Sequence, residues 1–169
     1  MRVLILNGAP RSGKDTFITY ATVAYPGRVI SYSAIDHIKS VARERLSWDG
    51  AKDRRGRRLL SDLKAAATRY NDLPFKMITG RAVVHGLYII VAREPAEIGK
   101  LRAYYDGRGI WCRTVIICRE SAEKAAMSLD NPADLGYAAY DYDHMVENNS
   151  GLTALWFQVD AFVVGLDTP

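Results

Sequence analysis

The stretch Asn7-Gly8-Ala9-Pro10-Arg11-Ser12-Gly13-Lys14-Asp15-Thr16 follows the apolar residues 3–6 and precedes a segment with helical character. This stretch has the spacing of a Walker A loop: Gly8, four further residues and then Gly13-Lys14. In such a loop the glycines let backbone N–H groups turn inward around phosphate oxygens. The helix that follows adds its positive N-terminal end, and Lys14 adds a full charge. The alternative is a glycine-rich turn whose lysine binds nothing. We predict that an NTP binds here, on Gly8, Ala9, Arg11, Ser12, Gly13, Lys14, Asp15 and Thr16.

Asp15 stands where a Walker A loop usually carries Ser or Thr. In that loop the hydroxyl contacts Mg²⁺. Two substitutes are present, because the Asp15 carboxylate can hold the ion directly or through water and Thr16 can supply the hydroxyl. We therefore predict ATP and Mg²⁺ as cofactors and Asp15 and Thr16 as metal ligands.

Length and composition indicate one intracellular domain. The 169 residues can bury a proper core but are few for two compact domains. The formal charge of +4 suits a protein that handles nucleotides, nucleic acid or only counterions, and does not choose among them. Cys112 and Cys118 lack metal or redox spacing, so both are expected to be reduced packing residues. No run of residues resembles a signal peptide or a membrane span, so we expect a soluble, cytoplasmic protein with no membrane partner. The three histidines are scattered, and no catalysis is assigned to them: His37, His85 and His144.

The order of the expected elements favours an α/β fold. Strands are expected at about residues 28–32, 86–92, 112–118 and 141–146, in addition to the strand before the loop, and a closing helix at 152–164. Ser33 or Asp36 is expected to cap the second helix. A βαβα start with a phosphate loop at its first turn predicts a three-layer α/β/α P-loop NTPase fold around a parallel five-stranded sheet.

Two segments interrupt this pattern. Residues 47–58 are polar, strongly basic and without periodicity, which predicts a loop or mobile arm before a helix at 59–70 and a short helix from Pro74 to about 81. Residues 129–140 also lack apolar periodicity, as is typical of lids. We predict a single domain with a substrate-binding arm at about 47–81 and a lid region at about 119–140.

Several of these segments resemble the P-loop nucleoside monophosphate kinases, and within them the deoxynucleoside monophosphate kinases of bacteriophages. Residues 12–16 (SGKDT) are similar to the loop of that group, in which Asp after the lysine is usual. Residues 31–39 (SYSAIDHIK) are similar to its second-strand segment, where an Asp and a Lys lie on the substrate side. Residues 142–152 (YDHMVENNSGL) resemble its last strand and turn, with an Asn near the adenine. The resemblance implies substrate contacts for Asp36 and Lys39, an adenine contact for Asn149, and the host cytoplasm as the location of a phage-encoded enzyme.

One segment departs from that family. The phage kinases tend to have Asp-Val-Arg after the third strand, whereas this chain has Val91-Ala92-Arg93. The arginine is retained and the aspartate is absent. A second magnesium carboxylate would then come from Asp36 or Glu94, or the ion would rely on Asp15 and the phosphates.

Phosphoryl transfer requires mainly that donor and acceptor are aligned and that charge on the moving group is neutralised, so the candidate residues are cations. Lys14 is expected to bridge the terminal phosphates of the donor. Arg11 either reaches the same group or the acceptor, or is a solvated loop residue. Arg119, and less so Lys124, stands where a lid cation would approach the transferred phosphoryl group.

Arg93 and Asp36 are the remaining predicted catalytic residues. Arg93 follows a buried strand, where open α/β sheets place their ligands, and we expect it to bind a substrate phosphate. Its alternative is a salt bridge at the helix start, with Glu97 or Asp36. Asp36 can accept a hydrogen bond from the acceptor or hold magnesium-bound water, and its alternative is a helix cap.

The basic arm supplies further candidates. One or two of its five cations are expected to contact an acceptor phosphate, with Lys52 and Arg58 favoured, although such runs are more often solvated. Trp48, Tyr70 and Asn71 can frame a base, but core packing is the stronger expectation for the two aromatic residues. The predicted substrate-binding residues are Asp36, Lys39, Lys52, Arg58, Tyr70 and Arg93.

The leading hypothesis is an ATP- and Mg²⁺-dependent kinase that phosphorylates a small-molecule substrate, a nucleoside monophosphate, with a deoxynucleotide favoured. The first alternative is a kinase acting on a hydroxymethylated base within phage DNA, suggested by the basic arm and the missing aspartate. The second is a nucleotide-regulated binding module without transfer activity. The oligomeric state is left open, with a homodimer as one option.

Overall fold

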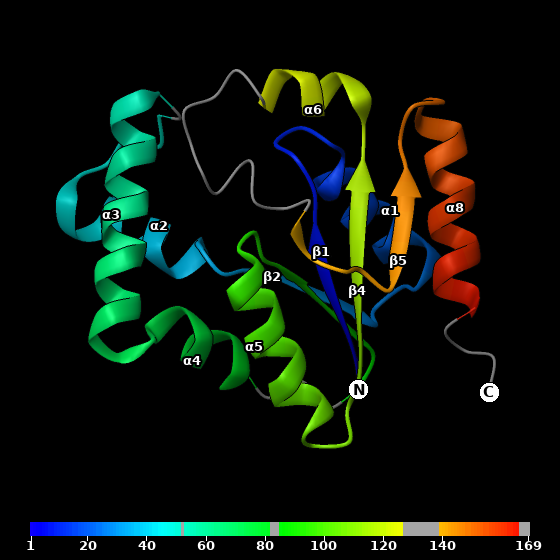
Figure 1. Ribbon diagram of the computed structural model, residues 1–169, viewed down its shortest axis with the longest axis horizontal. Coiled ribbons are helices and arrows are strands. Elements are labelled where there is room, and N and C mark those ends of the chain that lie inside the picture. The colour runs from blue at the N-terminus through cyan, green and yellow to red at the C-terminus, as the bar shows by residue number, and fades with distance from the viewer. Residues whose placement is uncertain (52, 82–84, 127–138, 166–169) are drawn as a thin grey trace. The chain divides into compact units, whose positions relative to one another are not determined.

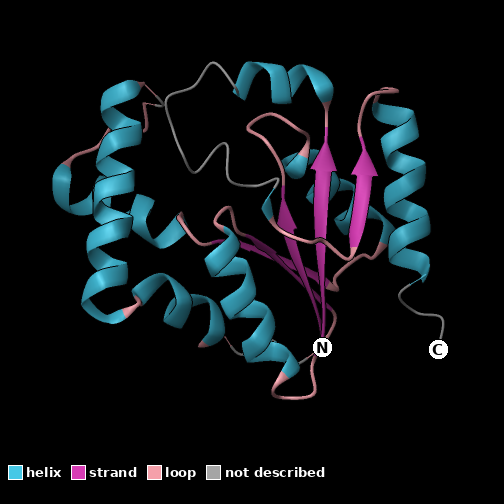
Figure 2. Ribbon diagram, viewed as in Figure 1, coloured by secondary structure: helices cyan, strands magenta, loops and turns pink. Residues whose placement is uncertain are grey.

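The computed structural model describes residues 1–51, 53–81, 85–126 and 139–165 (Figure 1). Strands and helices alternate along most of the chain, as Figure 2 shows. The elements are β1 (Arg2–Asn7), α1 (Lys14–Ala24), β2 (Val29–Ser33), α2 (Asp36–Leu46), α3 (Arg54–Asn71), α4 (Leu73–Thr79), β3 (Leu87–Val91), α5 (Pro95–Asp106), β4 (Trp111–Cys118), α6 (Glu120–Ala126), β5 (His144–Glu147) and α8 (Leu152–Gly165).

The five strands form one sheet in the order β2-β3-β1-β4-β5. β1 lies in the middle and pairs in parallel with β3 on one side and with β4 on the other, so that Leu4 lies opposite Ile89 and Arg113. β4 in turn pairs in parallel with β5. The predicted fold class, a parallel five-stranded sheet with flanking helices, is confirmed. Because parallel strands place their carboxyl ends at one edge, the loops after β1, β3 and β4 emerge as neighbours.

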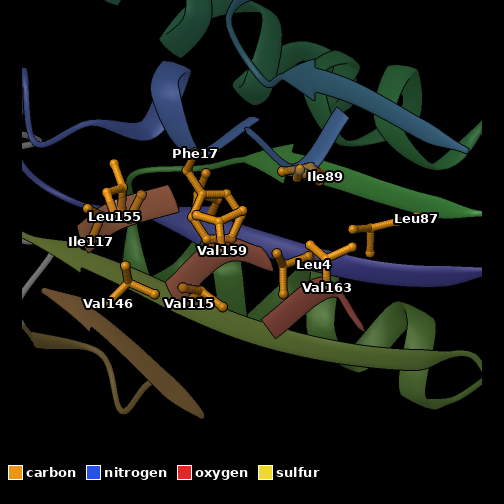
Figure 3. Packing of buried hydrophobic residues seen from close by; sticks show 12 residues of the cluster. Leu4, Phe17, Leu87, Ile89, Val115, Ile117, Val146, Leu155, Val159 and Val163 are labelled. Atoms are coloured by element: carbon orange, nitrogen blue, oxygen red, sulfur yellow. The ribbon is translucent and has the colours of Figure 1, made fainter. Parts of the chain in front are cut away.

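The core explains why β1, β3 and most of β4 are almost continuously apolar. Side chains on one face of the sheet pack against α1 and α8, and Figure 3 shows Phe17 of α1 and Val159 of α8 beside the strand residues Leu4 and Val115. α5 contacts β1 and β4 and buries Ile98 and Leu101. A strand covered on both faces has no solvated side, which removes the usual polar alternation.

The chain divides into two compact units, residues 1–31 with 83–169 and residues 32–82. The first contains most of the sheet with α1, α5, α6 and α8. In the second, α2, α3 and α4 contact one another. Its internal packing includes Trp48, whose Nε1 donates to Ala51 O at 3.2 Å, and a 3.8 Å stacking of the Arg81 guanidinium on the Tyr32 ring. Among the described residues, no helix is long and apolar enough to cross a membrane.

Several expected boundaries are wrong. α3 begins at Arg54 and includes Arg54–Arg58 of the predicted loop, because Asp53 caps it by accepting the Gly56 N–H at 2.7 Å. Neither Ser33 nor Asp36 caps α2; Ile35 holds that position, and Asp36 starts the helix. β5 begins at His144 instead of residue 141.

Two expectations about packing have different outcomes. Tyr70 was expected to pack in the core, but it is 87% exposed at the end of α3. Cys112 is buried and Cys118 half-buried, and both are free thiols. Burial raises the pKa of Cys118 to about 11, and nearby Glu123 adds to the shift. Both observations on the cysteines agree with reduced packing residues.

Candidate phosphate-binding site at the end of strand β1

The loop after β1 has a backbone that only particular residues allow. Gly8, Arg11 and Gly13 have φ angles of 143°, 66° and 113°. A Cβ atom on Gly8 would overlap the carbonyl oxygen of Ile117 and lie 2.7 Å from Ser12 Oγ, and one on Gly13 would overlap the Asn148 amide nitrogen. Both glycines are therefore required by positive φ and by close approach.

Lys14 closes the loop upon itself. Its Nζ donates to the carbonyl oxygens of Gly8 and Ala9, both at 2.7 Å. Inside the loop, the Ser12 N–H donates to Ala9 O at 3.1 Å, and α1 starts with the Phe17 N–H donating to Gly13 O at 2.8 Å. The ammonium group is thus held over the loop at the positive end of α1.

The hydroxyl of Ser12 tests whether this loop fits a phosphate. Ser12 is completely buried, and within the part of the chain that the structure describes its Oγ has no hydrogen-bond partner. An unsatisfied buried hydroxyl costs about 1–3 kcal/mol, so its persistence beside a lysine and a helix N-terminus needs a reason. An anion bound in the loop would supply the missing acceptor. The donors present therefore fit a nucleotide phosphate.

The predicted metal ligands lie in the first turn of α1. Asp15 is exposed and Thr16 half-buried, at the same end of the helix as the loop. Among the described residues there is no cluster of three or more His, Cys, Asp or Glu that could hold a metal ion. An ion at this position would take few ligands from the protein, and oxygen atoms of phosphates and water would have to complete its shell.

The three predicted arginines follow three neighbouring strands. Arg11 lies in the loop after β1, Arg93 two residues after the end of β3, and Arg119 directly after β4. All three are exposed. Because β3, β1 and β4 are adjacent and parallel, the sheet brings these segments to one edge. Figure 1 shows β4 and β5 ending at that edge, where α6 begins.

Asn7 joins two of these segments, a role that the sequence pattern did not indicate. It is fully buried, and its Oδ1 accepts the Gly8 N–H at 2.8 Å. Its Nδ2 donates to Arg93 O at 3.1 Å and to the hydroxyl of Tyr142 at 2.7 Å. The sequence did contain one sign of this role, an Asn at the end of an apolar run, because a buried side-chain amide needs several hydrogen-bond partners.

Two consecutive asparagines follow β5 and reach two different elements. Asn148 Nδ2 donates to Ser12 O at 2.7 Å, and Asn149 Oδ1 accepts the N–H of Glu120, the first residue of α6, at 3.0 Å. The hydrogen bond of Asn149 is thus a structural one at the start of α6. Its predicted adenine contact stays a prediction. Asn148, which was not among the residues selected from the sequence, is the one that touches the phosphate loop.

The segment before β5 is fastened by Asp143. Its carboxylate accepts both Arg102 guanidinium N–H groups, at 2.9 and 3.0 Å, and the N–H and hydroxyl of buried Thr114, at 2.8 and 2.9 Å. Burial by itself would raise the pKa of Asp143, but these hydrogen bonds and the Arg102 charge outweigh it and lower the pKa below its ordinary value. Burial raises the pKa of Tyr142 in the same segment to about 12.

The predicted substrate residues of the other unit have local partners. Asp36 accepts the Ser33 N–H at 2.9 Å and pairs with Lys39 at 3.2 Å, so its carboxylate serves the start of α2. Arg58 pairs with Asp62 at 3.7 Å on the exposed face of α3. Lys52 and most of the predicted lid, residues 127–138, lie outside the described residues.

Comparison with known proteins agrees with this geometry at the level of the fold. No protein-family model and no curated protein sequence matches the chain. Solved structures do. The gluconokinase from Sinorhizobium meliloti 1021 is 14% identical, with 98% of this chain and 93% of that chain covered and a TM-score of 0.54. The chain shares its α/β fold, a parallel five-stranded sheet with flanking helices, with this kinase structure.

Two further structures support the same conclusion. The Mycobacterium tuberculosis APS kinase CysC in complex with AMPPNP and APS is 14% identical, with 97% of each chain covered and a TM-score of 0.52. TT1252 from Thermus thermophilus is 16% identical, with 98% of this chain and 97% of that chain covered and the same TM-score. At these identities the likeness concerns the fold alone.

Proposed function

We propose that the protein is an ATP-dependent phosphotransferase that moves the γ-phosphoryl group of ATP to a nucleoside monophosphate, ribo- or deoxyribo-. The observation that carries the proposal is the loop at residues 8–16, which combines the Lys14 ammonium, held on the carbonyl oxygens of Gly8 and Ala9, with the N-terminus of α1 and a buried Ser12 hydroxyl that has no partner among the described residues. Such a group of donors stabilises the oxygens of a bound anion, and a phosphate group fits it. A similar fold binding AMPPNP together with APS supports a site for two nucleotides.

The cations at the carboxyl edge of the sheet give this loop a transfer chemistry. In phosphoryl transfer the protein mainly positions two groups and neutralises charge on the moving one. Lys14 would contact the terminal phosphates of the donor, and Arg11, Arg93 and Arg119 would face the transferred group and the acceptor phosphate. Bidentate arginine contacts suit phosphates particularly well. Mg²⁺, which such a reaction uses to neutralise phosphate charge, would be held by Asp15 and Thr16.

Residues 32–82 would supply further contacts to the acceptor. The proposed contacts there are Asp36, Lys39, Lys52, Arg58 and Tyr70, with Asn149 near the adenine of ATP. The exposure of Tyr70 supports its assignment, because a solvated ring is available for stacking on a base. Asp36 and Lys39 would have to exchange their mutual ion pair for contacts with the substrate.

The decisive experiment is a labelled-ATP transfer assay against all ribo- and deoxyribonucleoside monophosphates, with ATP binding measured separately by isothermal titration calorimetry. Lys14→Ala should lower transfer about 100-fold or more, because it removes a preorganised charge from the transition state. Lys100→Ala, an exposed lysine elsewhere in the same unit, is the matched control and should leave transfer unchanged. The proposal would be refuted if the protein did not bind ATP, or if Lys14→Ala transferred phosphate as fast as the wild type.

A second candidate, a kinase acting on a hydroxymethylated base in DNA, is favoured by one observation. Residues 32–82 contain twelve Lys and Arg but only six Asp and Glu. A hydroxymethylated duplex belongs in the same assay for that reason. Label transferred to the duplex, with none to free nucleotides, would replace the first candidate by the second. ATP binding without transfer to any acceptor would instead indicate a nucleotide-regulated binding module.

A further inference from the structure

The charge of the chain is divided unevenly between the two units. Residues 32–82 have a formal net charge of +6, whereas the rest of the chain, which contains the phosphate loop, has −2. This excess is outside the loop and outside the three arginines at the carboxyl edge of the sheet. A local charge of this size attracts anionic partners even when the whole protein is only weakly basic.

Within residues 32–82 the charge is concentrated on the solvent side of α3. The apolar residues Leu59, Leu60 and Leu63 lie on the inner side of the helix and are half-buried. Arg54, Arg58 and Arg69 are exposed, and at 3.6 residues per turn they fall within about 60° of one another around the axis. The exposed residues in and beside the same arc include three small ones: Ser61, Ala65 and Thr68. Exposed Asp62 lies at the margin of this arc, where it pairs with Arg58. We call the arginines and these small residues the α3 face.

The stability of α3 does not account for this arrangement. Four arginines lie within its first five residues, and the first turn has no acidic residue. Cations at that end oppose the helix dipole, which favours anions there. Arg58 and Asp62 form an ion pair at 3.7 Å, but their side chains are 84% and 71% exposed, respectively. Solvent therefore screens their attraction. Arg54 and Arg58 therefore oppose the dipole of their own helix, whereas Arg69, in the last turn, is favoured by it. Exposed cations that do not stabilise their own helix suit an anionic partner.

We propose that the α3 face binds the sugar-phosphate backbone of duplex DNA. The rise from Arg54 to Arg58 is about 6 Å, close to the length of duplex axis that two successive phosphates of one strand occupy at about 3.4 Å each. Arg69 is about 16 Å further along the same straight helix, so the cations follow a rigid line. The small residues between them let a backbone approach closely.

The composition of the face distinguishes a duplex from a single strand. Proteins that hold single strands interleave cations with aromatic side chains on which bases stack. α3 has one aromatic residue, Tyr70, at its last turn, and none between Arg54 and Arg69. The face therefore offers contacts to phosphates and no stacking platform. This inference goes beyond phosphotransfer and stands whether the acceptor is a free nucleotide or a nucleic acid.

The test is fluorescence anisotropy of the full chain with a labelled 20-base-pair duplex, titrated over a series of salt concentrations. A triple variant, R54Q/R58Q/R69Q, should bind at least ten-fold more weakly at low salt. The slope of log K against log salt should become shallower by about 2 to 3, since each lost phosphate contact removes about 0.9. The matched control is R28Q/K100Q/R108Q, three exposed cations of the other unit, with the same change in net charge. It should retain the wild-type slope.

Each other outcome overturns the proposal. Equal weakening by both triple variants would show that only net charge matters. Tighter binding of a single strand of the same sequence, or of poly-glutamate at the same salt, would assign the face to another polymer. A thermal melt of each variant verifies folding. Calorimetric ATP binding, measured on the same samples, separates failure of this proposal from failure of the proposed kinase activity.

Discussion

The side-chain amide of Asn148 donates a 2.7 Å hydrogen bond to the main-chain carbonyl oxygen of Ser12, across 136 positions of sequence. The same nitrogen occupies the space that a side chain on Gly13 would need. Asn148 is 8% exposed, and its own N–H donates to Cys118 O at 2.8 Å. The turn after β5 therefore holds the phosphate loop in place from outside the loop.

Replacing Asn148 should weaken this hold. In Asn148→Ala the buried carbonyl of Ser12 loses its partner, which costs about 1–3 kcal/mol of unfolding free energy. We also expect weaker ATP binding, because the loop loses its fixed shape. Urea unfolding and calorimetry measure the two effects. Gln158→Ala is the control, since its amide bonds the exposed main chain of Glu147, away from the loop, and its loss should leave ATP affinity within about two-fold. Equal effects of the two variants would contradict the assigned role.

Gly13→Ala should abolish ATP binding and destabilise the fold by more than the cost of positive φ alone. That cost is about 1–2 kcal/mol for a left-handed residue. Gly27 isolates this cost, because its φ is 70° and a Cβ atom there would meet no other atom within 4 Å. Gly27→Ala should therefore lose about 1 kcal/mol in urea unfolding, and Gly13→Ala clearly more. If both lose the same amount, the overlap with Asn148 is relieved without consequence.

Tyr142→Phe should lower the unfolding free energy less than Asn7→Ala does. The first removes the hydroxyl that accepts from Asn7 Nδ2 but leaves the bonds of Asn7 to Gly8 and Arg93, so about 1 kcal/mol of stability should be lost. The second removes all three bonds and should cost about 2–4 kcal/mol and slow phosphotransfer, because the carbonyl group of Arg93 loses the side chain that fixes it beside the loop. Transfer assays beside urea unfolding would test the order. The reverse order would refute a linking role of Asn7.

Stability should depend on pH through Asp143. Its pKa is lower in the folded chain than in the unfolded chain, so the unfolded state binds more protons in the acid range. The stabilisation is present above about pH 4 and is lost as pH falls through the folded-state pKa. Asp143→Asn should destabilise the protein at pH 7 and flatten the acid limb of a plot of unfolding free energy against pH. Asp62→Asn, which removes an exposed carboxylate, should retain that limb.

Local patterns in the sequence were sufficient for the fold. The loop at residues 8–16 requires particular backbone angles and charges over a short run of consecutive residues, and each is written in the residue types, such as Gly8, Gly13 and Lys14. The apolar runs at β1, β3 and β4 likewise reflect burial on both faces of a parallel sheet. Arg93 and Arg119 could be placed at the carboxyl edge because parallel topology fixes where strands end.

The helix boundaries show where local patterns are insufficient. The basic run before residue 59 has no apolar periodicity, yet Asp53 and a buried Gly56 start α3 at Arg54, earlier than periodicity predicts. Gly56 suits its place because a side chain there would collide with Ala51 O and Trp48. Tyr70 lies seven residues after Leu63 and therefore on the same side of α3, yet it is exposed at the end of the helix. Which neighbours cover that end depends on the tertiary structure and not on a local pattern.

What the sequence by itself determined is the glycine-rich turn at residues 8–16, the parallel α/β fold and the positions of the cations that follow its strands, because these depend on neighbouring residues and on a repeating topology. Only the tertiary structure decided that Asn148 holds Ser12, that Asn7 joins Gly8 to Arg93, and that the Ser12 hydroxyl is buried. These contacts join residues far apart in the chain, and an amide in a sequence carries no sign of its distant partner. Hydrogen bonding is directional and short-ranged, so a partner is defined only once the strands and turns are in place.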